Sequence, residues 1–356
     1  MNLEEKQRKN LHEGFFKLRI HPALDFTKDK CYLGIFLPVK EKDLERDTLC
    51  ILTDERELFP ATKEELDKRL LSLKYKPIYF QRRISLECIK AFLAGRTVRP
   101  EIVFEEIKRE LERYIEFPSD NVCEYFAIWI IGTYLHPLFR VYPYIHLSGP
   151  KGCGKTKTLM LVNCLAFNSM FSESISTPSI YRSIQGSRCT LLIDETERFT
   201  NPERAKKFRV VLLSGYEQRT NVYSPKIMVN AHWFANVLES RSVKFVMRRT
   251  TNKEIWGREV DIIDERWQEL RDGLYLLMLN HWKEIAKIYQ SLANESELTN
   301  GEWELWKPIL AIGRFLSKKL YEKMFSFAEE KSKEKKECRG RALNPRPLGF
   351  SAPISL

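Results

Sequence analysis

The sequence feature that most constrains the fold is the segment Gly149-Pro150-Lys151-Gly152-Cys153-Gly154-Lys155-Thr156, which matches the pattern G-x-x-x-x-G-K-[ST] throughout. An apolar run at residues 144–148 precedes it, and a helical pattern at 157–166 follows it. Glycines let backbone N–H groups converge on phosphate oxygens, and the amino end of a helix adds partial positive charge. This order predicts a strand, a phosphate-binding loop and a helix.

The side chains of this loop have separate tasks toward a bound nucleotide. Lys155 can bridge the β- and γ-phosphates, and the Thr156 hydroxyl can ligate Mg²⁺. The expected cofactors are therefore ATP and Mg²⁺. The residues expected to contact the nucleotide are Gly149, Pro150, Lys151, Gly152, Cys153, Gly154, Lys155, Thr156 and Lys157.

An acidic pair, Asp194 and Glu195, ends a second apolar run one strand–helix unit further along the chain. Asp194 is placed to hold Mg²⁺ through its water shell, and Glu195 is placed to polarise a water against the γ-phosphate. The pairing favours a hydrolase over a small-molecule kinase, because a kinase activates its acceptor hydroxyl and has less use for a water-activating glutamate.

Short apolar runs alternate with helical patterns through the middle of the chain, which predicts a parallel α/β sheet. The five expected strands are 144–148, 172–176, 190–194, 226–230 and 243–247. With the two nucleotide motifs, residues 141–250 resemble a P-loop ATPase of the additional-strand, catalytic-glutamate division, closest to AAA+-like proteins and viral replicative helicases. Residues 142–152 and 212–216 are also similar to ATPases of archaeal and phage mobile elements, often found beside primase domains.

The resemblance implies further site residues. A polar residue at the tip of the strand after the acidic pair would contact the γ-phosphate or the attacking water; Asn230 fits, with His232 as the competitor and a plain polar turn as the alternative. An arginine just before the next strand would reach a neighbouring subunit's nucleotide. Arg241 fits that position and Arg219 is a second candidate, while a surface salt bridge is the other interpretation of Arg241.

The implied domain order is an N-terminal α+β accessory domain at 1–118, a P-loop ATPase core with a parallel sheet and flanking helices at 119–255, a helical lid at 256–336 and a disordered tail at 337–356. Within the lid, Arg266 and Arg271 are both candidates for a sensor arginine. The resemblance also implies a homo-oligomeric ring, commonly of six subunits.

The charge favours a polyanionic partner, because 59 Lys and Arg face 48 Asp and Glu, for a net charge of +11. Residues 203–253 hold eleven Lys and Arg and three acids, interleaved with Tyr216, Tyr223, His232, Trp233 and Phe234. Basic side chains can follow a phosphate backbone while aromatic rings stack on bases. Residues 219–226 and 232–234 are the candidate DNA-facing loops; the alternative is that the aromatics are core and the lysines are solvated.

Other classes are excluded more simply. Eight cysteines without C-x-x-C spacing and only 6 histidines argue against zinc. The longest apolar run, 125–135, is too short to span a bilayer, and the polar N-terminus has no secretory signal, so a cytoplasmic protein is expected. The predicted function is an ATP-hydrolysing, DNA-dependent motor or helicase-like replication protein. The alternative is an AAA+-like protein-remodelling or regulatory ATPase that does not bind DNA.

Overall fold

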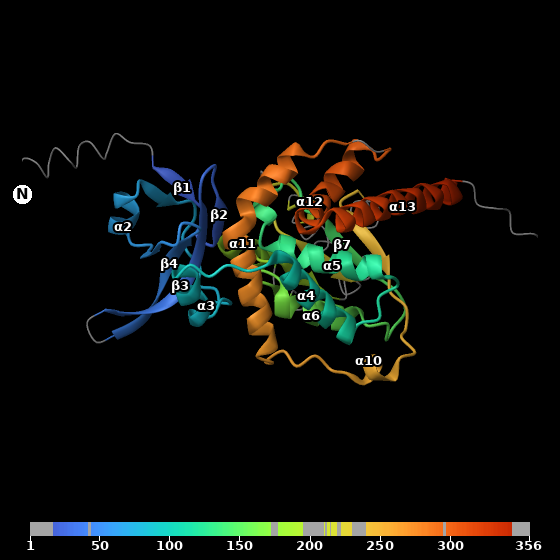
Figure 1. Cartoon of the computed structure of the whole chain (residues 1–356), viewed down its shortest axis with the longest axis horizontal. Coiled ribbons are helices and arrows are strands. Elements are labelled where there is room, and N and C mark those ends of the chain that lie inside the picture. The colour runs from blue at the N-terminus through green and yellow to red at the C-terminus, as the bar shows by residue number, and fades with distance from the viewer. Residues whose placement is uncertain are drawn as a thin grey trace, which may run out of the picture.

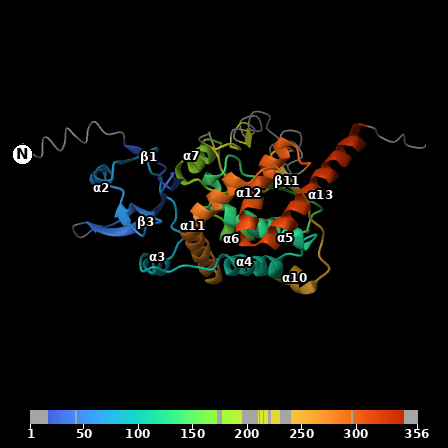
Figure 2. The same cartoon turned by 45° about the horizontal axis from the view of Figure 1, so that its top comes forward.

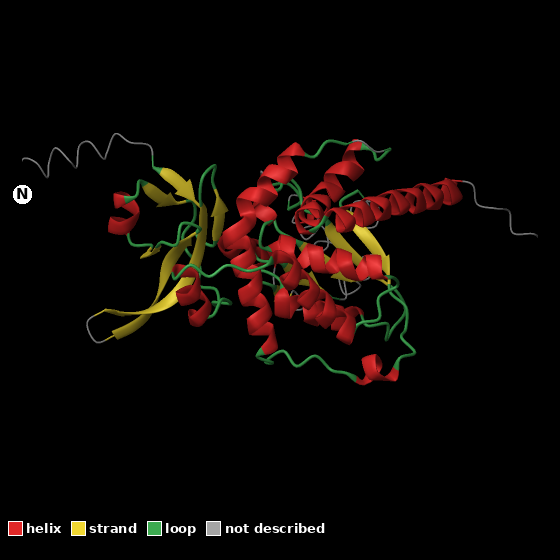
Figure 3. Ribbon diagram, in the orientation of Figure 1, coloured by secondary structure: helices red, strands yellow, loops and turns green. Residues whose placement is uncertain are grey.

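A computed structural model of the chain describes residues 17–41, 44–171, 177–194, 210, 212–213, 215–218, 222–229, 240–294 and 297–343. A strand-rich N-terminal part lies beside a larger part in which helices cover a sheet (Figure 1). The long helix α11, Arg266–Ser291, runs along the border between the two parts (Figures 1 and 3).

The N-terminal part contains a four-stranded antiparallel sheet of order β2-β3-β4-β5 and a parallel pair, β1 and β6. The hydroxyl of Thr62 accepts a hydrogen bond from the Glu65 N–H and so begins the short helix α2. A small separate core closes this part, formed by Ile20, Tyr32, Ile51, Phe59, Leu66 and Leu71. The elements are β1 Leu18–Ile20, β2 Leu24–Phe26, β3 Cys31–Glu41, β4 Leu44–Thr53, β5 Leu58–Pro60, α2 Lys63–Lys68 and β6 Leu71–Leu73.

Two helices follow, α3 Leu86–Leu93 and α4 Pro100–Tyr114. Proline at the first position of α4 needs no hydrogen-bond partner there, which favours a helix start. The apolar face of α4 packs on α5 and α11, so α4 shares the core of the larger part. Helix α4, which comes before the expected domain boundary at residue 118, therefore packs with elements that follow that boundary.

The larger part is built on a parallel sheet of order β11-β7-β10-β9-β8. Strand β10 lies between β7, which leads into the glycine-rich loop, and β9, which leads to the acidic pair. The second expected strand, 172–176, lies outside the described residues, and the strand found before it is β8. The strands are β7 Tyr144–Ser148, β8 Met170–Phe171, β9 Leu191–Ile193, β10 Lys226–Val229 and β11 Ser242–Val246.

Helices cover this sheet (Figure 3). Helix α5 is buried at every residue from 122 to 133 and packs against α4, α12 and α13. That burial explains the apolar run noted in the sequence. The helices are α5 Asp120–Thr133, η1 His136–Leu138, α6 Lys155–Leu165, α7 Thr177–Ser187, α10 Lys253–Gly257, α11, α12 Asn300–Leu316 and α13 Lys318–Leu343.

The C-terminal helices differ from expectation at one point. Helix α13 extends away from the body at the end opposite the N-terminal part (Figure 2) and continues to Leu343, so residues 337–343 are helical rather than part of a disordered tail. Alternating lysine and glutamate at helical spacing, such as the Lys331–Glu334 pair at 2.7 Å, favours this extension. Among the described helices, none is long and apolar enough to cross a membrane.

Candidate nucleotide site

Strand β7, buried along its whole length, positions the glycine-rich loop at the carboxyl edge of the sheet. Gly149, Gly152 and Gly154 have φ of +140°, +78° and +84°, in the region that favours glycine. A Cβ at Gly149 would also overlap the carbonyl oxygen of Met247. Helix α6 starts directly after the loop without a side-chain cap, so the N–H groups of its first turn are available to an anion.

The Lys155 ammonium lies inside the loop. Its Nζ is 2.8 Å from the carbonyl oxygens of both Gly149 and Pro150 and 3.5 Å from the Sγ of Cys153. The residue is only 9% exposed, and its described partners include no carboxylate. Carbonyl oxygens hold the cation without neutralising it, so the loop presents a positive charge to any anion that enters.

Thr156 and Asp194 meet at the same edge of the sheet. The Thr156 hydroxyl donates a hydrogen bond of 2.9 Å to Oδ2 of Asp194. Mg²⁺ prefers oxygen ligands and commonly binds through one or two protein oxygens together with substrate phosphates and waters. A hydroxyl and a carboxylate beside a phosphate-binding loop fit that ion, and they are the residues that would hold it. The described residues contain no cluster of three or more His, Cys, Asp or Glu side chains for a metal bound by protein alone.

These groups line one cavity of about 740 Å³. Two segments that the sequence patterns did not indicate complete it: the connector at 114–116, which starts at the last residue of α4, and the segment after β11. Trp256, on α10, lies at the cavity and is 73% exposed. The lining residues are Tyr114, Ile115, Glu116, Gly149, Lys151, Gly152, Cys153, Gly154, Lys155, Thr156, Lys157, Asp194, Val229, Arg248, Thr250, Ile255 and Trp256.

The segment 248–258, called the strap below, is tied to the loop and to its helix. The Arg249 Nε donates to the carbonyl oxygen of Lys151 at 2.9 Å, and the Lys157 Nζ donates to that of Ile255 at 2.8 Å. Burial under the strap, followed by the charge of Arg258, lowers the pKa of Lys157. Lys157 therefore lines the cavity with its ammonium turned to the strap.

Two further contacts join the strap to the neighbourhood of α4. The Thr250 hydroxyl donates to a carboxylate oxygen of Glu116, and Arg258 Nη1 donates to the carbonyl oxygen of Arg113 at 2.9 Å. The adjacent Arg248 and Arg249 are a sequence signal for this wall, but within residues 203–253 they indicate only a basic stretch. The connector gave no signal because its role depends on how α4 packs.

Several predicted site residues fall elsewhere. Glu195, Asn230, His232 and Arg219 lie outside the described residues. Val229, the last residue of β10, lines the cavity, so the chain reaches the cavity immediately before Asn230.

Arg241 lies at the opposite edge of the sheet from the loop. Its carbonyl oxygen accepts a hydrogen bond of 2.9 Å from the N–H of Tyr144, the first residue of β7, whereas the loop follows the last residue of that strand. Its Nη1 donates to the carbonyl oxygen of Leu213, and its guanidinium lies 5.3 Å from the ring centroid of Tyr216. The five residues of β7 span about 16 Å, so Arg241 cannot reach a phosphate in its own subunit's loop.

The two candidate sensor arginines also point elsewhere. Arg266 pairs with Glu269 at 2.9 Å and Glu110 at 3.5 Å, and Arg271 Nη1 donates to the carbonyl oxygen of Cys164 at 2.9 Å. Neither side chain lines the cavity.

Part of the basic stretch is core. Tyr216, Tyr223 and Lys226 are buried, so the expectation that they face a nucleic acid is wrong. The alternative holds for the two tyrosines, which are core, but not for Lys226, which is enclosed rather than solvated. Lys226 is fully enclosed, with its Nζ 3.0 Å from the carbonyl oxygen of Ser224 and 3.2 Å from that of Gly215. Residues 232–234, the other candidate loop, lie outside the described part of the chain.

Comparison with known proteins gives little likeness in sequence. No family model and no curated protein matches the chain. A solved structure described as "SCCmec type IV Cch - active helicase" is similar at a TM-score of 0.38 and 10% sequence identity. That match covers 92% of this chain and 83% of the other.

Proposed function

We propose that this chain binds ATP with Mg²⁺ and hydrolyses it to drive a DNA-dependent motor of the helicase type. The observation that carries the proposal is the meeting of a glycine-shaped anion loop, the Lys155 ammonium and the Thr156–Asp194 pair in one cavity. These are the groups that phosphoryl transfer needs, because its catalysis consists mainly of positioning and charge stabilisation.

In this proposal the phosphates lie in the loop, against the N–H groups at the start of α6. The Lys155 ammonium exchanges its bonds to the Gly149 and Pro150 carbonyls for β- and γ-phosphate oxygens. The Thr156 hydroxyl and Asp194 would hold Mg²⁺, which would supply neutralisation of the phosphate charge. Glu195 takes the proton of the attacking water, and Asn230 orients that water or the γ-phosphate.

The strand order supports assignment to the additional-strand, catalytic-glutamate division. Strand β10 separates the strand of the phosphate loop from the strand of the acidic pair. This insertion leaves the tip of β10 between the two motifs, where a polar residue can contact the γ-phosphate. This strand order fits an AAA+-like core, and in this proposal the C-terminal helices form its lid.

The nucleoside lies at the other end of the cavity, between the connector and the strap. The connector and the strap contribute Tyr114, Ile115, Ile255 and Trp256 to the cavity lining, and their apolar and aromatic surfaces suit a purine. The exposed Trp256 ring is available to stack on the base, and the four tethers of the strap hold that wall in place.

DNA dependence and assembly into a ring are the finer parts of the proposal. The net charge of +11 favours a polyanionic partner. Since Arg241 cannot reach its own subunit's phosphates, its proposed role requires an adjacent subunit. A protein-remodelling ATPase would share the same cavity but would not respond to DNA.

The deciding experiment is the ATPase rate of purified protein without DNA and with single- or double-stranded DNA, across a salt series. Lys155→Ala serves as the negative control, because ATP should bind weakly when the positive charge closest to its triphosphate is removed. We expect DNA to raise the wild-type rate, and the stimulation to fall with salt. An equal rate in wild type and Lys155→Ala would contradict ATP hydrolysis at this site; a normal rate indifferent to DNA at low salt would favour the remodelling alternative.

A further inference from the structure

A second cavity, of about 440 Å³, lies at the far end of α6 from the phosphate loop. We call it the distal groove. The linker that follows β6 forms one wall, and α6, β8, α7, α11 and the segments adjoining them form the rest. The lining residues are Ile78, Tyr79, Phe80, Gln81, Arg82, Arg83, Asn163, Cys164, Asn168, Ser169, Met170, Ser183, Ser187, Cys189, Ile262, Gln268 and Arg271.

The groove is positively charged. Three arginines, Arg82, Arg83 and Arg271, line it, and its described lining contains no carboxylate. The nearby carboxylate of Asp272 accepts hydrogen bonds from Ser85 N and Oγ, at 2.9 and 2.6 Å, and from Gln268 Nε2 at 2.9 Å. None of the ion pairs described in the structure includes any of the three arginines.

Two of the arginines are fixed by the carboxyl end of α6. Arg83 donates to the carbonyl oxygens of Cys164 and Ala166, at 2.9 and 2.8 Å, and Arg271 donates to that of Cys164 at 2.9 Å. Carbonyl dipoles hold the guanidinium groups in place and leave their full charge. Burial, and then the charge of Arg83, lower the pKa of Arg271, as expected where two cations share a site. Arg82 makes no side-chain hydrogen bond among the described contacts.

The linker adds exposed aromatic surface. Residues 74–83, KYKPIYFQRR, hold four basic and three aromatic side chains and no acid. Tyr79 is 62% exposed, and its ring lies 5.1 Å from that of Phe36 on β3, which supports it from the N-terminal part. An aromatic ring standing beside uncompensated guanidinium groups is the pattern that binds unpaired bases and their backbone.

We infer that the distal groove binds single-stranded nucleic acid, with Arg82 contacting a backbone phosphate, Arg83 and Arg271 adding positive charge from their bonded positions, and Tyr79 stacking on a base. A duplex keeps its bases stacked and would leave the ring without a partner. The inference deepens the proposed DNA dependence and rests on it only for the link to hydrolysis, because binding itself requires no nucleotide.

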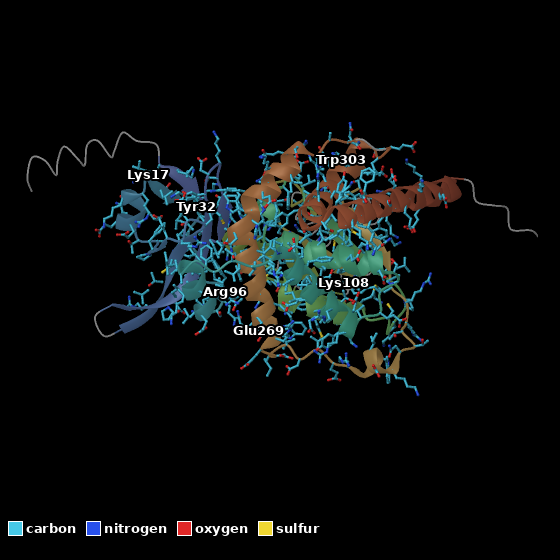
Figure 4. All side chains as sticks on the ribbon, in the orientation of Figure 1. Lys17, Tyr32, Arg96, Lys108, Glu269 and Trp303 are labelled. Carbon is cyan, nitrogen blue, oxygen red and sulfur yellow. The ribbon has the colours of Figure 1, made fainter. Side chains whose placement is uncertain are left out.

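The test is fluorescence anisotropy of a labelled oligothymidylate of about 20 nucleotides, without ATP. Tyr79→Ala should weaken binding about 5- to 150-fold, the range measured for losing one stacked base. Arg82→Ala should also weaken it and reduce the slope of log affinity against log salt by about 0.7, the value for one phosphate contact on a single strand. Tyr181→Ala, on α7, and Arg96→Ala, just beyond α3 (Figure 4), change exposed side chains outside the groove and should bind as wild type.

Each outcome decides the inference. Wild type that fails to bind the oligonucleotide, or variants Tyr79→Ala and Arg82→Ala that bind as wild type while melting normally, would overturn it. A duplex competing as well as the single strand would also overturn it. The ATPase rate is measured in parallel with and without the oligonucleotide: binding with no hydrolysis in either condition would contradict the proposed function alone, and hydrolysis without binding would contradict the groove alone.

Discussion

The Thr156 hydroxyl lies 2.9 Å from Oδ2 of Asp194, although β10 separates β7 and β9, the strands that lead to the two residues. The two residues come together because the chain leaves the parallel strands β7 and β9 at the same edge of the sheet. A hydroxyl and a carboxylate held together beside the phosphate loop define where a divalent cation would bind.

Asp194→Asn should raise the Mg²⁺ concentration needed for half-maximal ATPase about 10- to 100-fold, the usual cost of removing a partner that acts through the metal's water shell. The amide keeps the shape but loses the negative charge. A Mg²⁺ titration of the ATPase rate measures this, with Asp29→Asn, an exposed carboxylate of the N-terminal part, as control. An unchanged Mg²⁺ requirement would exclude Asp194 from the metal site.

Glu195→Gln should retain ATP binding and lose hydrolysis about 10²-fold or more, because the amide cannot accept the water's proton. Binding of a fluorescent ATP analogue and single-turnover hydrolysis separate the two effects. Near-normal turnover would move the water-activating role to another side chain, with His232 the next to substitute.

Trp256→Ala should weaken ATP binding about 2- to 12-fold, as expected for one aromatic stacking contact. Inorganic tripolyphosphate, which occupies only the loop, should bind the variant and wild type equally. An equal loss of affinity for both ligands would mean that Trp256 supports the strap and does not stack on the base. An unchanged affinity for both ligands would mean that Trp256 does not contribute to the site.

The parts of the site encoded locally could be predicted from the sequence. The glycines of the loop, the buried strand before it and Asp194 at the end of β9 each follow from a short pattern. The connector at 114–116 and the strap could not be found, because they reach the cavity only through the packing of α4 and their contacts with Lys151 and Lys157. The exposure of Lys226 could not be predicted for a related reason. A lysine in a basic stretch predicts a solvated surface, and only the tertiary structure shows that this side chain is enclosed.

Lys226 predicts a pH dependence of stability. Its burial lowers its pKa from 10.5 to about 7. Between these values the unfolded chain binds the proton and the folded chain releases it, so this group makes the free energy of unfolding rise with pH, by at most about 1.4 kcal/mol per pH unit. Urea unfolding at pH 7, 8 and 9 should show the advantage of wild type over Lys226→Met growing with pH. Lys244→Met, an exposed change on β11, is the control, and parallel pH curves for wild type and Lys226→Met would contradict the prediction.

Arg241 gives the prediction on which the ring depends. Its guanidinium rests on the Leu213 carbonyl and over Tyr216, at the sheet edge opposite its own phosphate loop. If it completes a neighbour's site, Arg241→Ala should keep nucleotide binding and lose hydrolysis about 10³-fold, within the range that arginine fingers contribute. The wild-type rate per subunit should also rise with protein concentration as subunits associate.

Mixing two inactive variants distinguishes an arginine finger, which completes the site of a neighbouring subunit, from an arginine with only a structural role. Arg241→Ala and Glu195→Gln subunits are each inactive alone in this proposal, but some mixed interfaces would join an intact Glu195 to a neighbour's intact Arg241 and restore part of the activity. An arginine that only holds the Leu213 carbonyl would instead cost about 0.5–1.5 kcal/mol of stability, the net value of one hydrogen bond, and leave hydrolysis intact. A rate independent of concentration, together with no recovery in the mixture, would exclude the trans contact and remove the main reason to expect a ring.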